Sequence, residues 1–217
     1  MKKTTHRLIS LALTCAAFGA NAATLSVGNT GVDGSQWSYS VNNGAFTAAQ
    51  SVAGNAFPFP YWAANTSTSS WVSTRSSYSD VGSDLQNTAY TFRTSFNLAS
   101  GFDPHSLSLN GRWMADNTGL SILVNGQSIA QAAMPGTGNG EGFRGWTDFA
   151  LGGNFRTGTN TVDFVVYNLA GTYGNPTGFR AEFSPASVNA VPEPETYALM
   201  GLGLTGLVLT RRRKFQK

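Results

Sequence analysis

Cysteine is nearly absent from this sequence, and the single example, Cys15, lies close to the N-terminus. Cys15 is inside an apolar run that follows a basic N-terminus, and Ala20 and Ala22 form a small-residue cleavage site after it. This order is typical of a secretory signal peptide. We predict that signal peptidase removes residues 1–22, which leaves no thiol for a disulfide, for metal binding or for nucleophilic catalysis.

Positive charge is scarce in the body of the chain. The formal net charge is +3 at pH 7, yet eight of the 14 lysines and arginines lie in the two terminal segments. Residues 23–190 hold six arginines, nine acidic residues and no lysine, so their net charge is six minus nine, or −3. A protein that binds nucleic acid through its charge carries a basic face. The sequence therefore predicts no nucleic-acid partner.

Side chains of the common catalytic motifs are also few. His105 is the one histidine left after the signal peptide, and the chain contains neither G-x-S-x-G nor H-E-x-x-H. Five carboxylates are available for the acid–base pair of a glycosidase, but their spacing selects no two of them. They are Asp116, Glu141, Asp148, Asp163 and Glu182. We predict a protein that is not an enzyme, and we keep a small glycan-active hydrolase as an alternative.

Helical periodicity is missing between residues 23 and 190, and strict alternation takes its place. Apolar side chains alternate with serine in Trp37–Val41 and with polar residues in Tyr90–Phe96. Asn125-Gly126 follows another apolar run and is a strong signal for a tight hairpin turn. Short strands separated by glycine, asparagine and proline turns predict an all-β fold, a single antiparallel β-sandwich, over residues 23–190.

The mature sequence has one long apolar run, at its C-terminus. Residues 196–210 are uncharged and mostly apolar, and a basic cluster follows them. A helix of this length spans about 22 Å, against roughly 30 Å of hydrocarbon, and local thinning of the bilayer offsets the difference. We predict a single transmembrane helix over residues 196–210. The basic residues that stop it on the cytoplasmic side are Arg211, Arg212, Arg213 and Lys214.

An acidic segment stiffened by prolines precedes this run. Its four motif residues are Val191, Pro192, Glu193 and Pro194. With the apolar run and the basic cluster, they resemble a PEP-CTERM sorting signal, the mark of bacterial proteins handled by an exosortase. The signal divides into a motif at residues 191–195, the helix, and a basic tail at residues 211–217. The resemblance implies transient anchoring in the inner membrane, recognition by the exosortase, removal of the helix, and release at the cell surface or outside the cell.

A series of strand and turn motifs runs along the mature domain. The pieces are Pro60-Tyr61-Trp62, Tyr90–Phe96, Phe102-Asp103-Pro104, Ala115-Asp116-Asn117, Val124-Asn125-Gly126, Gly158–Val162 and Asn175–Arg180. In this order they resemble the galactose-binding-like jelly-roll sandwich. The resemblance implies a jelly-roll fold for the mature domain, with carbohydrate as the class of ligand.

Aromatic and polar residues in loops form the predicted ligand site. Sugar rings stack their C–H faces on tryptophan or tyrosine, while polar side chains bond the hydroxyl groups. The ligand residues that we predict are Glu141, Arg144, Trp146, Tyr173 and Trp62. For Trp62, as for Trp71 and Trp113, the alternative is a place in the core of the sandwich, where tryptophan is mostly buried.

Two polar segments have competing interpretations. Asp116 and Asn117 follow a strand pattern, and their oxygens predict a structural Ca²⁺ site, the one cofactor that the sequence suggests. The alternative for this pair is a turn in which the side chain bonds the backbone. Residues 65–79 are rich in serine and threonine, which fits a flexible linker, a glycan acceptor or a plain polar loop.

These patterns lead to one functional hypothesis and one structural alternative. The first is an exported surface or extracellular-matrix protein whose β-sandwich binds carbohydrate or exopolysaccharide. The alternative is a structural surface-coat or biofilm matrix protein that self-associates. The partners expected in either case are signal peptidase and exosortase during export, and the inner membrane transiently.

Overall fold

The computed structural model of the protein describes residues 22–32, 36–78, 84–130, 133–171, 175–192 and 194–214. Residues 22–191 form one compact unit, and the C-terminal helix belongs to a second unit. Three of the residues predicted above to have a role, Ala20, Tyr173 and Glu193, lie outside the described residues.

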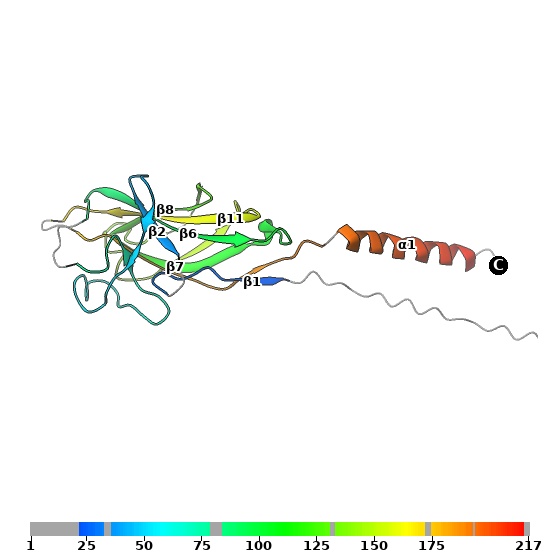
Figure 1. Ribbon diagram of the computed structural model, residues 1–217, viewed down its shortest axis with the longest axis horizontal. Coiled ribbons are helices and arrows are strands. Elements are labelled where there is room, and N and C mark those ends of the chain that lie inside the picture. The colour runs from blue at the N-terminus through cyan, green and yellow to red at the C-terminus, as the bar shows by residue number, and fades with distance from the viewer. Residues whose placement is uncertain are drawn as a thin grey trace, which may run out of the picture. The chain divides into compact units, whose positions relative to one another are not determined.

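The first large sheet has six antiparallel strands in the order β3-β2-β6-β11-β8-β9. Their bounds are Thr47–Ala48 for β3, Trp37–Val41 for β2, Thr88–Leu98 for β6, Gly158–Asn168 for β11, Thr118–Val124 for β8 and Gln127–Ile129 for β9. The centre of this sheet is the long pair β6–β11, in which Arg93 lies opposite Asp163. In Figure 1 these two strands run side by side.

The second large sheet has five antiparallel strands in the order β10-β7-β12-β5-β4. Their bounds are Thr147–Gly152 for β10, Ser108–Asp116 for β7, Gly178–Phe183 for β12, Val72–Ser73 for β5 and Gln50–Ser51 for β4. A 3₁₀-helix at Pro104–Ser106 precedes β7. In Figure 1 strand β7 belongs to this second layer, which lies beside the layer that contains β6 and β11.

Alternation along the strands places large apolar side chains from both sheets in one core. The ring centroids of Phe164 on β11 and Phe179 on β12 are 4.8 Å apart, and Trp113 on β7 is 5.1 Å from Phe164. All three rings are completely buried. The prediction of an all-β, antiparallel sandwich is therefore confirmed, and so is the buried position of Trp71 and Trp113.

The hairpin predicted at Asn125-Gly126 joins β8 to β9. Both residues have positive φ, 51° for Asn125 and 78° for Gly126. Asparagine and glycine adopt this backbone region more readily than other residues, which is why the pair marks tight hairpins. The local sequence signal for this turn is confirmed.

The segment from Val52 to Ser70, here called the cap loop, covers part of the outer face of the five-stranded sheet. Trp62 of the cap loop packs in a second buried cluster with Trp71 and with Met114, whose side chain leaves β7 on the outer side. Gly178 on β12 makes room for this packing, because a Cβ there would overlap the ring of Trp62. The sandwich thus has a small second core beneath the cap loop.

The two ends of the sandwich chain are paired with each other. Strand β1 (Ala23–Leu25) forms a separate antiparallel pair with β13 (Ala186–Val188). Beyond β13, the backbone N–H of Val191 donates to the carbonyl of Gly101 at 2.8 Å. The chain is therefore hydrogen-bonded to the sandwich up to the first residue of the predicted sorting motif.

The C-terminal segment forms one helix, α1 (Pro194–Lys214). It contains the whole of the predicted apolar helix at residues 196–210. Among the helices that the structure describes, none combines the length and the apolar content needed to cross a bilayer. The membrane-spanning role of this segment stays a prediction.

Candidate functional site

The outer face of the six-stranded sheet carries a cleft centred on one ion pair. Because side chains alternate along a strand, burial of Phe92 and Phe164 sends their neighbours Arg93 and Asp163 to the opposite, outer face. The guanidinium donates from Nε to Oδ1 at 2.6 Å and from Nη2 to Oδ2 at 2.7 Å. This is the two-pronged geometry that gives arginine–carboxylate pairs their strength.

The two members of this pair differ in exposure. The Asp163 side chain is 5% exposed and the Arg93 side chain is 34% exposed. Hydrogen bonding to Asp163 raises the pKa of Arg93 above its usual value, although partial burial acts in the opposite direction. Arg93 is therefore a permanent cation in this cleft, and Asp163 holds it in one orientation.

An exposed aromatic ring completes the cleft. Phe46, in the turn between β2 and β3, is 39% exposed, and its ring centroid lies 4.0 Å from Cζ of Arg93. A guanidinium at this distance from a ring makes a favourable cation–π contact. The hollow has a volume of about 270 Å³. Its lining consists of Ser40, Asn43, Gly44, Phe46, Thr91, Arg93, Leu123, Asp163 and Val165.

The cleft offers both of the contacts that a sugar needs. No described residue accepts a hydrogen bond from Nη1 of Arg93, so two N–H donors remain for a ligand. Thr91 and Asn43 add a hydroxyl and an amide, and Phe46 adds an apolar surface. The volume of about 270 Å³ is slightly below the range of drug-sized ligand pockets, roughly 300–1,000 Å³. We call this group, built on Phe46, Arg93 and Asp163, the Phe46 site.

Trp146, one of the predicted ligand residues, lies on the other sheet in a similar setting. It is half-buried, and the Cζ atoms of Arg112 and Arg180 are 4.5 Å and 4.9 Å from its ring centroid. Arg112 donates from Nη2 to Oε2 of Glu182 at 2.7 Å, across the strand pair β7–β12. The ring is therefore held among charged side chains at the outer face of the five-stranded sheet.

The structure places the other predicted ligand residues in different settings. Glu141 and Arg144 form an exposed ion pair with 3.2 Å between Oε1 and Nε, and Arg144 lies over the ring of Phe143. Trp62 is only 2% exposed, so its expected place on the surface is wrong and the core alternative holds. Trp62 and Trp146 do share the second buried cluster, in which Trp62 is interior and Trp146 is at the border.

Asp116 and Asn117 are buried and are engaged with protein groups. Oδ2 of Asp116 accepts a hydrogen bond from Nε1 of Trp62 at 2.7 Å, while Oδ1 has no partner among the described residues. Oδ1 of Asn117 accepts from the backbone N–H of Leu169 and from Nδ2 of Asn175. The side chain of Asn117 thus braces a neighbouring loop, and Ca²⁺ binding by this pair stays a prediction.

Burial has a large effect on Asp116. Desolvation, with a smaller contribution from the nearby carboxylate of Asp84, raises the pKa of Asp116 to about 8, although the bond from Trp62 acts in the opposite direction. Asp116 is therefore mostly protonated at neutral pH in the folded protein. No group of three or more histidine, cysteine, aspartate or glutamate side chains is arranged to hold a metal in the described part of the chain.

The serine- and threonine-rich segment is held on the sandwich by hydrogen bonds and is not a flexible linker. Arg180, only 1% exposed, donates to Oγ of Ser69 at 2.7 Å, to the carbonyl of Ala64 at 2.5 Å and to Oγ1 of Thr66 at 2.8 Å. Burial lowers the pKa of Arg180, and attraction to the carboxylate of Glu182 partly offsets this. One arginine on β12 therefore holds three positions of the cap loop.

Glu182 links the cap loop to Arg112 through hydrogen bonds. Its Oε1 accepts hydrogen bonds from Oγ of Ser69 at 2.7 Å and from Oγ1 of Thr68 at 2.8 Å. Burial by itself raises the pKa of Glu182, but the bonds from Ser69, Thr68 and Arg112 outweigh it and hold the pKa below its usual value. Glu182 is therefore negatively charged, and its carboxylate accepts hydrogen bonds from two hydroxyl groups of the protein.

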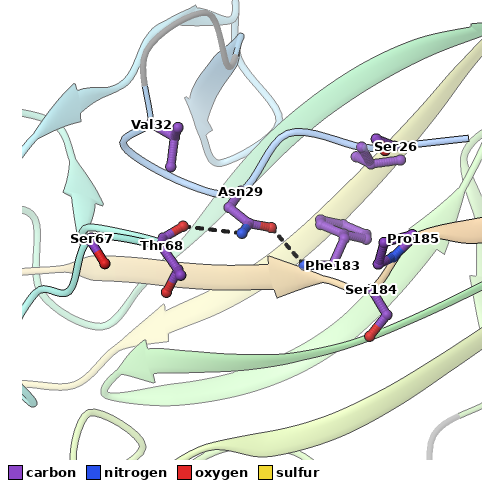
Figure 2. Close-up of a pocket in the computed structure, with 9 residues that line it drawn as sticks. Ser26, Asn29, Val32, Ser67, Thr68, Phe183, Ser184 and Pro185 are labelled. Carbon is purple, nitrogen blue, oxygen red and sulfur yellow. Dashed lines mark hydrogen bonds between the residues drawn. The ribbon is translucent and has the colours of Figure 1, made fainter.

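A second hollow, of about 310 Å³, lies where the N-terminal segment crosses the cap loop and the end of β12 (Figure 2). Asn29 crosses it: Nδ2 donates to the carbonyl of Thr68 at 3.0 Å, and Oδ1 accepts from the backbone N–H of Phe183 at 2.7 Å. Both ends of this amide thus hold the N-terminal segment on the sandwich. Among the residues that the structure describes, none that lines this hollow is charged, and the Phe46 site is the better candidate.

Sequence reasoning missed Phe46 and Arg93 as site residues. Arg93 stood at a polar position of an alternating strand, and Asp163 was among the five available carboxylates. The sequence does not show the strand register, which places Arg93 opposite Asp163 although the two are 70 residues apart in the chain. An exposed arginine on a strand, with a carboxylate at a polar position of a second strand, was the one signal present.

Comparison with known families identifies a motif at the C-terminus. Residues 190–214 match the family model of the PEP-CTERM protein-sorting motif. The chain carries this sorting motif. The motif implies an exported protein that an exosortase handles and delivers to the cell surface. The matched residues include Pro192, Pro194 and the basic residues at positions 211–214, which form the last turn of α1.

Other comparisons are less informative. The crystal structure of the CBM36-1 domain of a multidomain xylanase from the hindgut metagenome of Trinervitermes trinervoides is 13% identical in sequence, with a TM-score of 0.29. The match covers 80% of this chain and 100% of that domain. A TM-score this low supports no conclusion about ligand or activity. No curated protein matches the chain.

Proposed function

We propose that this exported, exosortase-sorted protein is a non-catalytic binding module that holds carbohydrate at the Phe46 site. The observation that carries the proposal is the combination, in one hollow, of an exposed ring and an arginine fixed by a buried carboxylate. The ring supplies a stacking surface and Nη1 of Arg93 supplies two donors for neighbouring hydroxyl groups. Because Asp163 neutralises Arg93, we expect an uncharged sugar to be preferred over an acidic one.

The Phe46 site lies away from the end of the sandwich at which the sorting motif begins. Arg93 lies five residues before the end of β6 at Leu98, a distance of about 17 Å along an extended strand. The loop after Leu98 is the part of the sandwich that binds Val191, the start of the sorting motif. The candidate site is therefore remote from the point at which the chain leaves the sandwich for its sorting signal.

Removal of the Phe46 ring is expected to weaken carbohydrate binding at least tenfold, or about 1.4 kcal/mol. The measurement is affinity electrophoresis of the exported form through gels that contain dextran, soluble β-glucan, galactomannan or an acidic polysaccharide. Phe46→Ala should be retarded clearly less than the native protein in a neutral polysaccharide. Tyr61→Ala is the matched control, because Tyr61 is 61% exposed and lies outside the hollow. Equal migration of native and heat-denatured protein in every gel would refute carbohydrate binding.

We further propose that α1 anchors the chain in the inner membrane until the exosortase removes it. Intact-mass spectrometry of the surface form should then find a chain that begins at Ala23 and has nothing beyond about Pro194. A variant with both Pro192→Ala and Pro194→Ala should keep its tail and remain in the membrane fraction. A surface form that still contains Arg211–Lys217 would contradict this processing.

A further inference from the structure

The outer face of the five-stranded sheet repeats the arrangement of the Phe46 site. Arg112 donates from Nε to Oε2 of Glu182 at 2.9 Å and from Nη2 to the same oxygen at 2.7 Å, and its Cζ lies 4.5 Å from the ring of Trp146. In both places an arginine on one strand binds a carboxylate on the neighbouring strand and contacts an aromatic ring. We call the group of Trp146, Arg112 and Glu182 the Trp146 site.

The charged pair of the Trp146 site is more exposed than that of the Phe46 site. The Arg112 side chain is 47% exposed and that of Glu182 is 14% exposed, compared with 34% and 5% for Arg93 and Asp163. Among the described residues, none accepts a hydrogen bond from Nη1 of Arg112. Its donors are therefore available beside a half-buried ring.

The chemistry of the Trp146 site also fits an uncharged sugar. Thr68 and Ser69 already donate hydroxyl hydrogen bonds to Glu182, so this carboxylate accepts from hydroxyl groups in the protein itself. The positive charges of Arg112 and Arg180 are balanced by Glu182 and by Asp148, which lies opposite Arg112 in the register of β10 and β7. A face with balanced charge and hydroxyl-binding groups favours a neutral, hydroxylated ligand.

The two sites point away from each other. Phe164 and Phe179 meet in the core with 4.8 Å between their ring centroids. Asp163 is next to Phe164 and leaves the six-stranded sheet on its outer side, whereas Glu182 leaves the five-stranded sheet on the side opposite to Phe179. A ligand at one site is therefore separated from a ligand at the other by the whole thickness of the sandwich.

From this geometry we infer that the protein is bivalent: each outer face binds one neutral polysaccharide chain, so a single molecule cross-links two chains. The inference rests on the proposed function, because it assigns the same class of ligand to a second site. It also joins the two hypotheses drawn from the sequence, since a monomer that cross-links polysaccharide acts as a structural component of a matrix.

Agglutination of polysaccharide-coated beads tests the inference, because a molecule with one site binds beads without bridging them. The probes are beads coated with dextran, soluble β-glucan or galactomannan, mixed with the exported form of the protein. The native protein should agglutinate one type of bead. Phe46→Ala and Trp146→Ala should each still bind that bead but lose agglutination, and the double variant should lose binding. Tyr61→Ala should behave as the native protein does.

A second variant and a folding control complete the experiment. Arg112→Gln is a second variant of the Trp146 site that spares the ring packed on the second buried cluster, and thermal melts show whether each variant is folded. Agglutination that survives in Phe46→Ala or in folded Arg112→Gln overturns bivalence while binding to the beads still supports the proposed function. Native protein that binds none of the beads overturns both.

Discussion

Replacement of Arg180 by methionine is expected to lower the free energy of unfolding by about 3–5 kcal/mol, the usual cost of breaking a buried charge network from one side. Arg180 donates three hydrogen bonds to the cap loop, and no apolar side chain of similar length replaces them. The variant also removes the bond to the carbonyl of Ala64 and leaves Oγ of Ser69 with its bond to Glu182. Urea denaturation of the exported form measures the loss, and hydrogen exchange should show fast exchange confined to the cap loop.

Arg144→Met is the matched control for this experiment. Arg144 also pairs with a glutamate, but its side chain is 54% exposed, and exposed pairs contribute only about 0–1 kcal/mol. Arg180→Lys is expected to lie near Arg180→Met, because one ammonium group does not reach the three positions that the guanidinium spans. A loss in Arg180→Met no larger than that in Arg144→Met would show that the cap loop is held by its apolar cluster alone.

Replacement of Asp116 by asparagine is expected to remove a strong dependence of stability on pH. In the folded protein burial raises the pKa of Asp116 to about 8, whereas an exposed aspartate titrates near 3.8. Between these two values the folded state keeps a proton that the unfolded state has lost. Stability from this group is complete below about pH 4 and falls as pH rises toward 8, by as much as about 1.4 kcal/mol per pH unit.

The test compares urea unfolding of the native protein and of Asp116→Asn at pH 5, 6, 7 and 8. The native protein should lose stability relative to the variant with each step, because the amide oxygen still accepts the bond from Trp62 but cannot ionise. Asp148→Asn, which changes an exposed carboxylate on the same sheet, should keep the native slope. Parallel curves for the native protein and Asp116→Asn would mean that Asp116 is not protonated in the folded state.

Several parts of the protein could be predicted from the sequence because their signals are local. The hairpin at Asn125-Gly126 depends on two adjacent residues whose backbone preferences are intrinsic. The strands follow from alternation within segments such as Trp37–Val41, and that pattern is set by the geometry of a single extended chain. The sorting motif is a linear arrangement of prolines, apolar residues and arginines, and the family match at residues 190–214 agrees with it.

The candidate sites could not be predicted from local sequence signals. Trp62 follows two prolines in a loop, which suggested exposure, but the cap loop folds back on the sheet and buries it. Trp146 follows Arg144 closely in the sequence, but its ring contacts Arg112 and Arg180, which come from two other strands. Neighbours along the chain, Glu141 and Arg144, instead form their own exposed pair.

The sequence by itself determined where the protein is sent and which class of fold it adopts, since targeting signals, turns and strand periodicity act over a few consecutive residues. The tertiary structure alone decided which charges meet. Arg93 with Asp163 and Arg112 with Glu182 are pairs whose members stand 70 residues apart. Their meeting depends on strand order and register, and a shift of one residue would turn every one of these side chains into the core.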